Sequence, residues 1–374
     1  MADLEYVRPY RTSAKWGAFP ADVLPLWVAE MDYPLSPAIA AALHDAIDRS
    51  DTGYRWPGDL PVALHEFWQR RFGWAPEPER VMVLGDVLVA MAETIRRMTD
   101  GAVVITPPAY PPFFRVVTDV VGRELVQVPL TAEGLEMDGL ERAFARPEVT
   151  SFLLGNPHNP TGHVWSRAQL EQIALMARRY GVTVISDEIW APLTMPGVQM
   201  TPYLSLGEEL TGPDIALVSA SKAFNLAGLK CAQVIGGSAE TATALTASIP
   251  AEITYSAGHL GVIATIAAFR DDDTWLDDTR EMLADNARLL QELLSEQLPA
   301  IQYGIPDATY LAWLDCRGLG LGDDPSAVFL ERGRVALNPG LDFGREGAGF
   351  VRLNLATVPD NIEVAVSRMR RAVG

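Results

Sequence analysis

The chain of 374 residues is 48% hydrophobic and 21% charged, and its formal net charge at pH 7 is −18. This length allows about two domains, and the acidic balance argues against nucleic-acid binding, because contacts to phosphates need clustered Lys and Arg. No run approaches the roughly 18 apolar residues of a membrane span, and the first residues lack the apolar stretch of a signal peptide, so we expect no membrane association and no secretion.

Short apolar runs alternate with helical patterns along the chain, which is typical of an α/β fold with a mostly parallel sheet. The first segment, rich in Pro, Trp and Tyr, has no clear period and is expected to wrap over another surface. Strands are expected at residues 102–106, 151–155, 182–186, 215–219, 310–314 and 350–355. Helices are expected at 88–98, 166–180 and 274–297 and from Asn361 onward.

Three polar motifs follow successive expected strands. They are Asn-Pro-His-Asn-Pro-Thr-Gly at 156–162, Asp-Glu-Ile-Trp at 187–190 and Ser-Ala-Ser-Lys at 219–222. Functional residues of open α/β sheets gather beyond the carboxyl ends of the strands. We therefore expect the site where these motifs meet.

Lys222 is the candidate nucleophile. The chain has only three lysines, Lys15, Lys222 and Lys230, so few residues can supply a primary amine. Lys222 follows an apolar strand and precedes Ala223 and Phe224, and desolvation there would lower its pKa and favour the neutral amine. The alternative is an ordinary strand-end lysine in solvent.

The other candidates each have a structural alternative. Asp187 could hold a proton on a heterocyclic nitrogen or cap a helix. Asn159 lies in a turn made rigid by two prolines, which could also be a plain loop. Gly85 precedes an expected helix whose first amides could bind a phosphate, although such transitions are common. Arg352, among apolar strand residues, could bind a carboxylate ligand or form a structural ion pair.

The remaining reactive residues give weaker signals. Cys231 and Cys316 could form a disulfide, but two free thiols in a reducing cytoplasm are the preferred interpretation. The five histidines show no metal-ligand spacing, and the chain has neither a serine-hydrolase elbow nor a Walker loop. We therefore expect a cytoplasmic protein without a metal site.

Taken together, the motifs resemble fold-type I pyridoxal-phosphate (PLP) enzymes of the aminotransferase class I/II superfamily, and most closely the MalY/PatB-type cystathionine β-lyase subgroup. The resemblance covers most of the chain. It rests on segments 27–34 (WVAEMDYP), 53–56 (GYRW), 107–114 (PPAYPPFF), 156–162, 186–189, 221–229 (SKAFNLAGL), 338–344 (NPGLDFG) and 349–356.

The resemblance implies a large domain with a mostly parallel mixed sheet flanked by helices, plus a smaller α+β domain. It divides the chain into an N-terminal segment at residues 1–40 that packs with the small domain, a PLP-binding domain at 41–280 and a small domain at 281–374.

It also implies residue roles. Lys222 would carry the cofactor as a Schiff base, and Tyr54 would reach the phosphate of the neighbouring subunit, so that a homodimer has composite active sites. Arg352 would bind the substrate α-carboxylate. The further residues that would contact the cofactor are Val87, Leu88, Tyr110, Asn159, Asp187, Trp190, Ser219, Ser221 and Lys230, and those that would face the substrate are Asn159, Tyr33 and Tyr310.

Three positions depart from the family pattern. Trp190 stands where aminotransferases have a tyrosine and related lyases usually a histidine. Lys230 replaces a phosphate-binding arginine, and Val87 and Leu88 lack a hydroxyl that often adds a phosphate contact.

The resemblance implies a PLP-dependent C–S lyase that cleaves a cysteine S-conjugate such as L-cystathionine by β-elimination to a thiol, pyruvate and ammonia. One alternative is an aminotransferase acting on an L-amino acid. Another is a regulator of the same fold without turnover, which the complete set of Lys222, Asp187 and Arg352 argues against.

Overall fold

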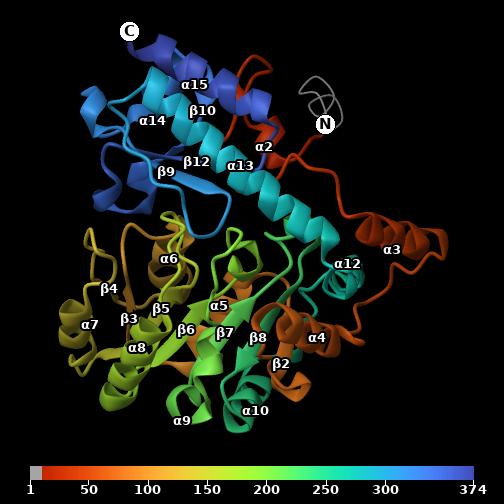
Figure 1. Cartoon of the computed structure of the whole chain (residues 1–374). Helices are drawn as coiled ribbons and strands as arrows, with labels where there is room; N and C mark the ends of the chain where they lie inside the picture. The colour runs from red at the N-terminus through yellow and green to blue at the C-terminus, as the bar shows by residue number, and fades with distance from the viewer. Residues whose placement is uncertain (1–10) are drawn as a thin grey trace.

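A seven-stranded sheet forms the centre of the computed structural model, which describes residues 11–374 (Figure 1). Its strand order is β2-β8-β7-β6-β5-β3-β4, and β8 alone runs antiparallel to its neighbours. The strands are β2 (Val81–Leu84), β3 (Ala102–Ile105), β4 (Leu125–Gln127), β5 (Val149–Gly155), β6 (Thr183–Asp187), β7 (Ile215–Val218) and β8 (Ala232–Gly236). The expected mostly parallel mixed sheet is confirmed, and the four strands predicted within it match β3, β5, β6 and β7 closely.

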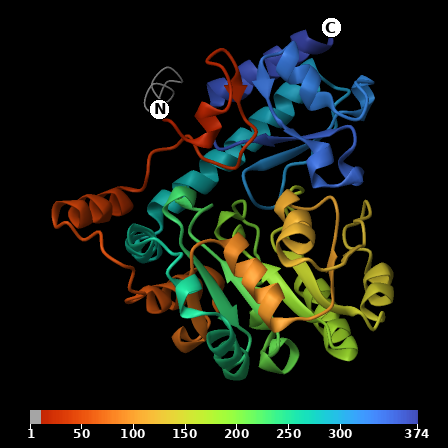
Figure 2. The same ribbon diagram turned by 180° about the vertical axis from the view of Figure 1, so that it is seen from behind.

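Helices cover both faces of this sheet, which explains why its strands are nearly continuous apolar runs. Helix α5 (Val87–Met98) covers the face seen in Figure 2, and α8 (Arg167–Tyr180) lies on the opposite face, seen in Figure 1. Ser166 and Gln169 form a reciprocal capping box that begins α8 where the sequence predicts it. The other helices of this part are α6 (Pro111–Arg115), α7 (Met137–Phe144), α9 (Glu208–Thr211), α10 (Ala239–Ser248) and α11 (Ala251–Thr254).

A smaller antiparallel sheet lies beyond the carboxyl ends of the large one. Its order is β11-β12-β9, with β9 at Leu311–Asp315, β11 at Asn338–Pro339 and β12 at Phe350–Asn354. The long helix α13 (Thr274–Gln297), which has its predicted bounds, passes from the large sheet to the small one, where it packs on α15 (Pro359–Val373) (Figure 1). Helix α14 (Pro325–Glu331) completes this region.

The N-terminal segment joins the C-terminal region rather than the large sheet. Strand β1 (Leu24–Pro25) pairs in parallel with β10 (Val335–Ala336), and both ribbon views place this segment beside the blue C-terminal elements (Figures 1 and 2). The chain then continues through α3 (Pro37–Asp48) and α4 (Leu60–Phe72), which both pack on α12 (His259–Arg270). Residues 1–10 of the predicted N-terminal segment lie outside the described residues. No helix formed by residues 11–374 is long and apolar enough to cross a membrane.

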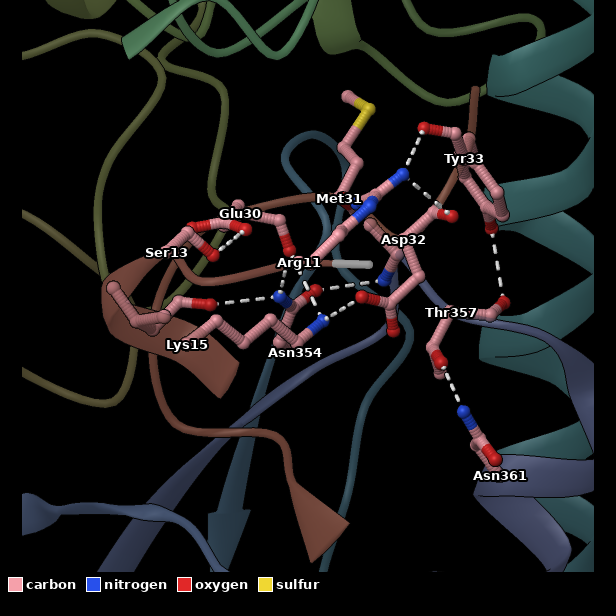
Figure 3. A network of polar contacts seen from close by, with 12 residues as sticks. Arg11, Ser13, Lys15, Glu30, Met31, Asp32, Tyr33, Asn354, Thr357 and Asn361 are labelled. Carbon is pink, nitrogen blue, oxygen red and sulfur yellow. Dashed lines mark hydrogen bonds and ion pairs between the residues drawn. The ribbon is translucent and has the colours of Figure 1, made fainter. Parts of the chain in front are cut away.

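A buried polar network fixes residues 27–33, which we call the bridging segment (Figure 3). Lys15, on the short helix α2 (Ala14–Gly17), is fully buried, and its Nζ lies 2.8 Å from Asp32 Oδ1. Arg11 donates to the carbonyl oxygens of Met31 (2.7 Å) and Tyr33 (3.0 Å). Asn354 on β12 donates to the carbonyl oxygens of Val28 and Glu30, each at 2.7 Å. The segment is therefore tied to the N-terminus and to the small sheet.

The Lys15–Asp32 pair makes the first testable prediction. Lys15→Met leaves the Asp32 carboxylate buried without its cation, so we expect it to lower the free energy of unfolding by about 3–5 kcal/mol. Urea denaturation measures the loss. Arg49→Met, which breaks an exposed pair with Asp45, is the control and should cost less than about 1 kcal/mol. Equal losses in the two variants would contradict a structural role for the buried pair.

Candidate active site

A cavity of about 450 Å³ lies where the carboxyl ends of the large sheet meet the small sheet. The loops after β5 and β7 contribute Asn159 and Lys222, the last residue of β6 is Asp187, and β12 contributes Arg352 from the opposite side. The predicted residues that line it are Val87, Leu88, Tyr110, Asn159, Asp187, Trp190, Ser221, Lys222, Lys230 and Arg352. The three polar motifs therefore converge at one edge of the sheet.

The amine of Lys222 is held at the inner wall of the cavity. Its Nζ donates to the carbonyl oxygen of Ala29 at 3.0 Å and lies 5.7 Å from the centroid of the Trp190 ring. Burial lowers the pKa of Lys222 to about 8, and the positive charge of Arg352 adds to this effect, while Asp187 opposes it. The neutral amine is thus available as a nucleophile or base at mildly alkaline pH.

Asp187 and Glu188 are adjacent acids with different surroundings. Asp187 Oδ1 accepts the Ile189 N–H at 3.1 Å, and the carboxylate lines the cavity. Glu188 instead accepts from Asn156, Ser186 and the Tyr203 N–H inside the protein. Burial raises the pKa of each to about 7. A ligand N–H or cation in the cavity would stabilise the ionised form of Asp187.

Arg352 is buried beside neutral partners. Its guanidinium donates to Asn159 Oδ1 (3.1 Å), Asn338 Oδ1 (2.8 Å) and the Trp27 carbonyl oxygen (3.1 Å). Within the described part of the chain it forms no ion pair with a carboxylate, so the structural ion pair considered for it is not found. Burial lowers its pKa to about 10, which leaves it charged near neutrality. An anionic ligand would compensate this charge.

The expected phosphate ligands gather at one end of the cavity. Val87 and Leu88 begin α5, Ser221 Oγ lies 2.8 Å from Ser219 Oγ, and Lys230 also lines the cavity. Ser219 is buried behind Ser221. Asp86, which the sequence analysis did not consider, caps α5 by accepting the Val89 N–H and pairs with Lys230 Nζ at 2.8 Å. Asp86 therefore partly neutralises the cation expected to bind the phosphate.

Four predicted site residues do not line the cavity of this chain: Ser219, described above, and Tyr33, Tyr310 and Tyr54. The Tyr33 hydroxyl donates to the Thr357 carbonyl oxygen at 3.1 Å and accepts from Asn286. Tyr310 is buried behind Trp190, with their ring centroids 4.8 Å apart. Tyr54 is 93% exposed on the surface. Tyr33 is thus held by hydrogen bonds and Tyr310 by a ring contact inside the protein.

The sequence analysis missed three further residues of the site, Trp27, Ala29 and Asn338. The carbonyl oxygens of Trp27 and Ala29 hold Arg352 and Lys222, although any residue type offers the same group. Asn338 connects Arg352 to Asp342 by accepting from one and donating to the other. The only signal for these residues was that they lie in segments that resemble the family.

Comparisons with known proteins identify the family of this chain. The model of the family Aminotransferase class I and II matches residues 21–369. A Mycobacterium tuberculosis protein described as a candidate cystathionine β-lyase is 44% identical over 99% of this chain and 97% of its own length. The cystathionine β-lyase of Corynebacterium glutamicum is 36% identical over 98% of both chains. The crystal structure of a candidate PLP-dependent β-cystathionase from Corynebacterium diphtheriae is 35% identical, covers 99% of this chain and 98% of its own, and superposes with a TM-score of 0.94.

The electrostatics of the cavity predict the reactivity of Lys222. In protein freed of bound small molecules, reductive labelling of Lys222 by a small aldehyde should rise with pH and reach half its maximum near pH 8, because the neutral amine reacts and burial lowers its pKa to about 8. Peptide mapping by mass spectrometry separates Lys222 from the other two lysines. Labelling that rises only around pH 10, as for an ordinary lysine, would contradict the assignment.

Proposed function

Because the chain belongs to the aminotransferase class I and II family, we propose that it is a PLP-dependent C–S lyase that cleaves a cysteine S-conjugate, such as L-cystathionine, to a thiol, pyruvate and ammonia. One observation carries the proposal: Lys222 and Arg352, which has no ion-pair partner among residues 11–374, line one cavity in a chain that matches lyase relatives over nearly its full length. The division into residues 1–40, 41–280 and 281–374 is part of the same proposal.

The cofactor of this family is pyridoxal 5′-phosphate, and the cavity fits it. When bound, it supplies an aldehyde that condenses with amines and a pyridinium ring that withdraws electrons from Cα. Asp187 offers a cavity-facing carboxylate for the ring N–H, and Asn159 and Trp190 offer N–H donors for the phenolic oxygen. Tyr110 would stack on the ring. The Val87 and Leu88 amides with Ser219, Ser221 and Lys230 would hold the phosphate.

Arg352, Lys222 and Asp187 each have a separate role in the proposed elimination. Arg352 binds the substrate α-carboxylate and so orients the Cα–H bond toward Lys222. The Lys222 amine, whose pKa burial lowers to about 8, removes the Cα proton in its neutral form, which predominates above that pH. Asp187 keeps the ring nitrogen protonated during this step. A thiolate then leaves Cβ, whereas transamination would need the proton returned to the cofactor instead.

We also propose a homodimer in which Tyr54 enters the partner's site. Tyr54, Trp56 and Tyr255 are 93%, 74% and 60% exposed, and the rings of Tyr54 and Tyr255 lie 6.4 Å apart. An exposed aromatic group of this kind is typical of an interaction surface. The free, buried thiols of Cys231 and Cys316 support a reducing cytoplasm as the location.

A reaction with L-cystathionine and no keto acid distinguishes the lyase from the aminotransferase. We expect thiol and pyruvate to accumulate over many turnovers, and Lys222→Ala to lower kcat at least about a hundredfold, because a general base contributes that much. Thiol and pyruvate assays measure both values, and circular dichroism checks that the variant folds. A single stoichiometric transfer of the amino group to the cofactor, without thiol release, would contradict the lyase and favour the aminotransferase.

Subunit complementation tests the composite site. Tyr54→Ala and Lys222→Ala are each expected to be nearly inactive, whereas a mixture that has exchanged subunits should regain activity up to about a quarter of the wild type, because half of the dimers are then mixed and each has one intact site. Activity assays after denaturation and joint refolding measure the gain. A monomer at assay concentrations, or no gain despite proven exchange, would contradict the proposal.

A further inference from the structure

Two charged residues line the cavity but have no role in the chemistry described above. Arg115 ends α6, the helix that begins directly after Tyr110. Its side chain is exposed, and among residues 11–374 its guanidinium has no hydrogen-bond or ion-pair partner. In a chain with a net charge of −18, where acidic side chains pair with most nearby arginines, a free guanidinium at the cavity is available for an anionic ligand.

Asp342 supplies the opposite charge. It lies in the turn Gly340–Phe343, is exposed, and also lines the cavity. Its Oδ2 accepts the Asn338 amide at 2.8 Å, and Asn338 Oδ1 in turn accepts from Arg352 at 2.8 Å. Only the Asn338 side chain therefore links Asp342 to Arg352, the proposed ligand of the α-carboxylate. Within the described residues, Asp342 has no ion-pair partner.

We propose that Arg115 and Asp342 form a second, outer amino-acid subsite, in which Arg115 binds the carboxylate and Asp342 the ammonium of the distal end of the substrate. The inference rests on the proposed function and narrows its substrate class to thioethers that carry an amino acid at both ends. The leaving thiol is then itself an amino acid. Arg352 and Lys222 serve the end that reacts, and the outer pair recognises the end that leaves.

The charge arrangement supports two separate subsites. Arg352 is buried and held by three neutral oxygens, which suits one fixed carboxylate next to the reacting carbon. Arg115 and Asp342 are exposed, and their chains come from opposite sides of the cavity, one from the large sheet and one from the small sheet. A substrate with a zwitterion at its outer end would contact both.

The test compares three thioethers: L-cystathionine, S-(3-carboxypropyl)-L-cysteine, which lacks the distal ammonium, and S-propyl-L-cysteine, which lacks both charges. For Arg115→Gln, the ratio of kcat/KM for each of the first two substrates to that for the third should fall by about ten- to a hundredfold, the effect of one lost charge-assisted hydrogen bond. For Asp342→Asn, the ratio should fall for cystathionine alone. Arg345→Gln, an exposed arginine outside the cavity, is the matched control and should change no ratio.

The outcomes separate this inference from the lyase proposal. Equal losses for all three substrates, or no loss in either variant, would overturn the outer subsite while pyruvate release still supports the lyase. If the wild type releases pyruvate from none of them, the lyase proposal fails. The subsite is then judged by binding alone: cystathionine should change the cofactor absorption band with a Kd about tenfold or more weaker in Arg115→Gln, and equal Kd values would reject it.

Discussion

The backbone of the bridging segment, residues 27–33, is the constraint on which the site depends. Lys222 comes from the large sheet and Arg352 from the small sheet, and both donate to carbonyl oxygens of this one segment, at Ala29 and Trp27. Asn225 fixes it further by bonding to both the N–H and the C=O of Met31. The relative position of Lys222, the proposed base, and Arg352, the proposed ligand of the α-carboxylate, is therefore fixed by contacts to a third element.

The buried Lys15–Asp32 pair extends this constraint to the N-terminus. Burial lowers the pKa of Lys15, although Asp32 opposes the effect. Removing the two charges from water therefore costs free energy that their attraction only partly offsets. Such a pair contributes little net stability, but its loss leaves an uncompensated charge beneath the bridging segment. The pair thus helps to hold in place the segment whose carbonyl oxygens accept from both Lys222 and Arg352.

The sequence analysis succeeded where side-chain chemistry and strand ends coincide. Lys222, Asp187 and Asn159 each follow a buried strand, and the topology brings the ends of β7, β6 and β5 together. Local chemistry alone does not separate Asp187 from its acidic neighbour Glu188, and the choice of Asp187 came from the resemblance to the family. In the structure Asp187 lines the cavity, whereas Glu188 accepts hydrogen bonds from Asn156, Ser186 and the Tyr203 N–H inside the protein. Backbone ligands such as Ala29, and long-range partners such as Asp86 and Lys230, depend on tertiary contacts that no local pattern encodes.

The electrostatics of the site couple substrate binding to the base. Burial is the largest cause of the lowered pKa of Lys222, and the charge of Arg352 is the next. A carboxylate bound by Arg352 would compensate that charge, remove this second cause and so raise the pKa of the Lys222 amine, which we propose as the base. Asp187, which favours the charged form of Lys222, acts in the same direction once a ring N–H keeps it ionised. In the proposed function, substrate and cofactor would thus each compensate a charge that burial leaves unbalanced, and each would separately raise the basicity of the Lys222 amine.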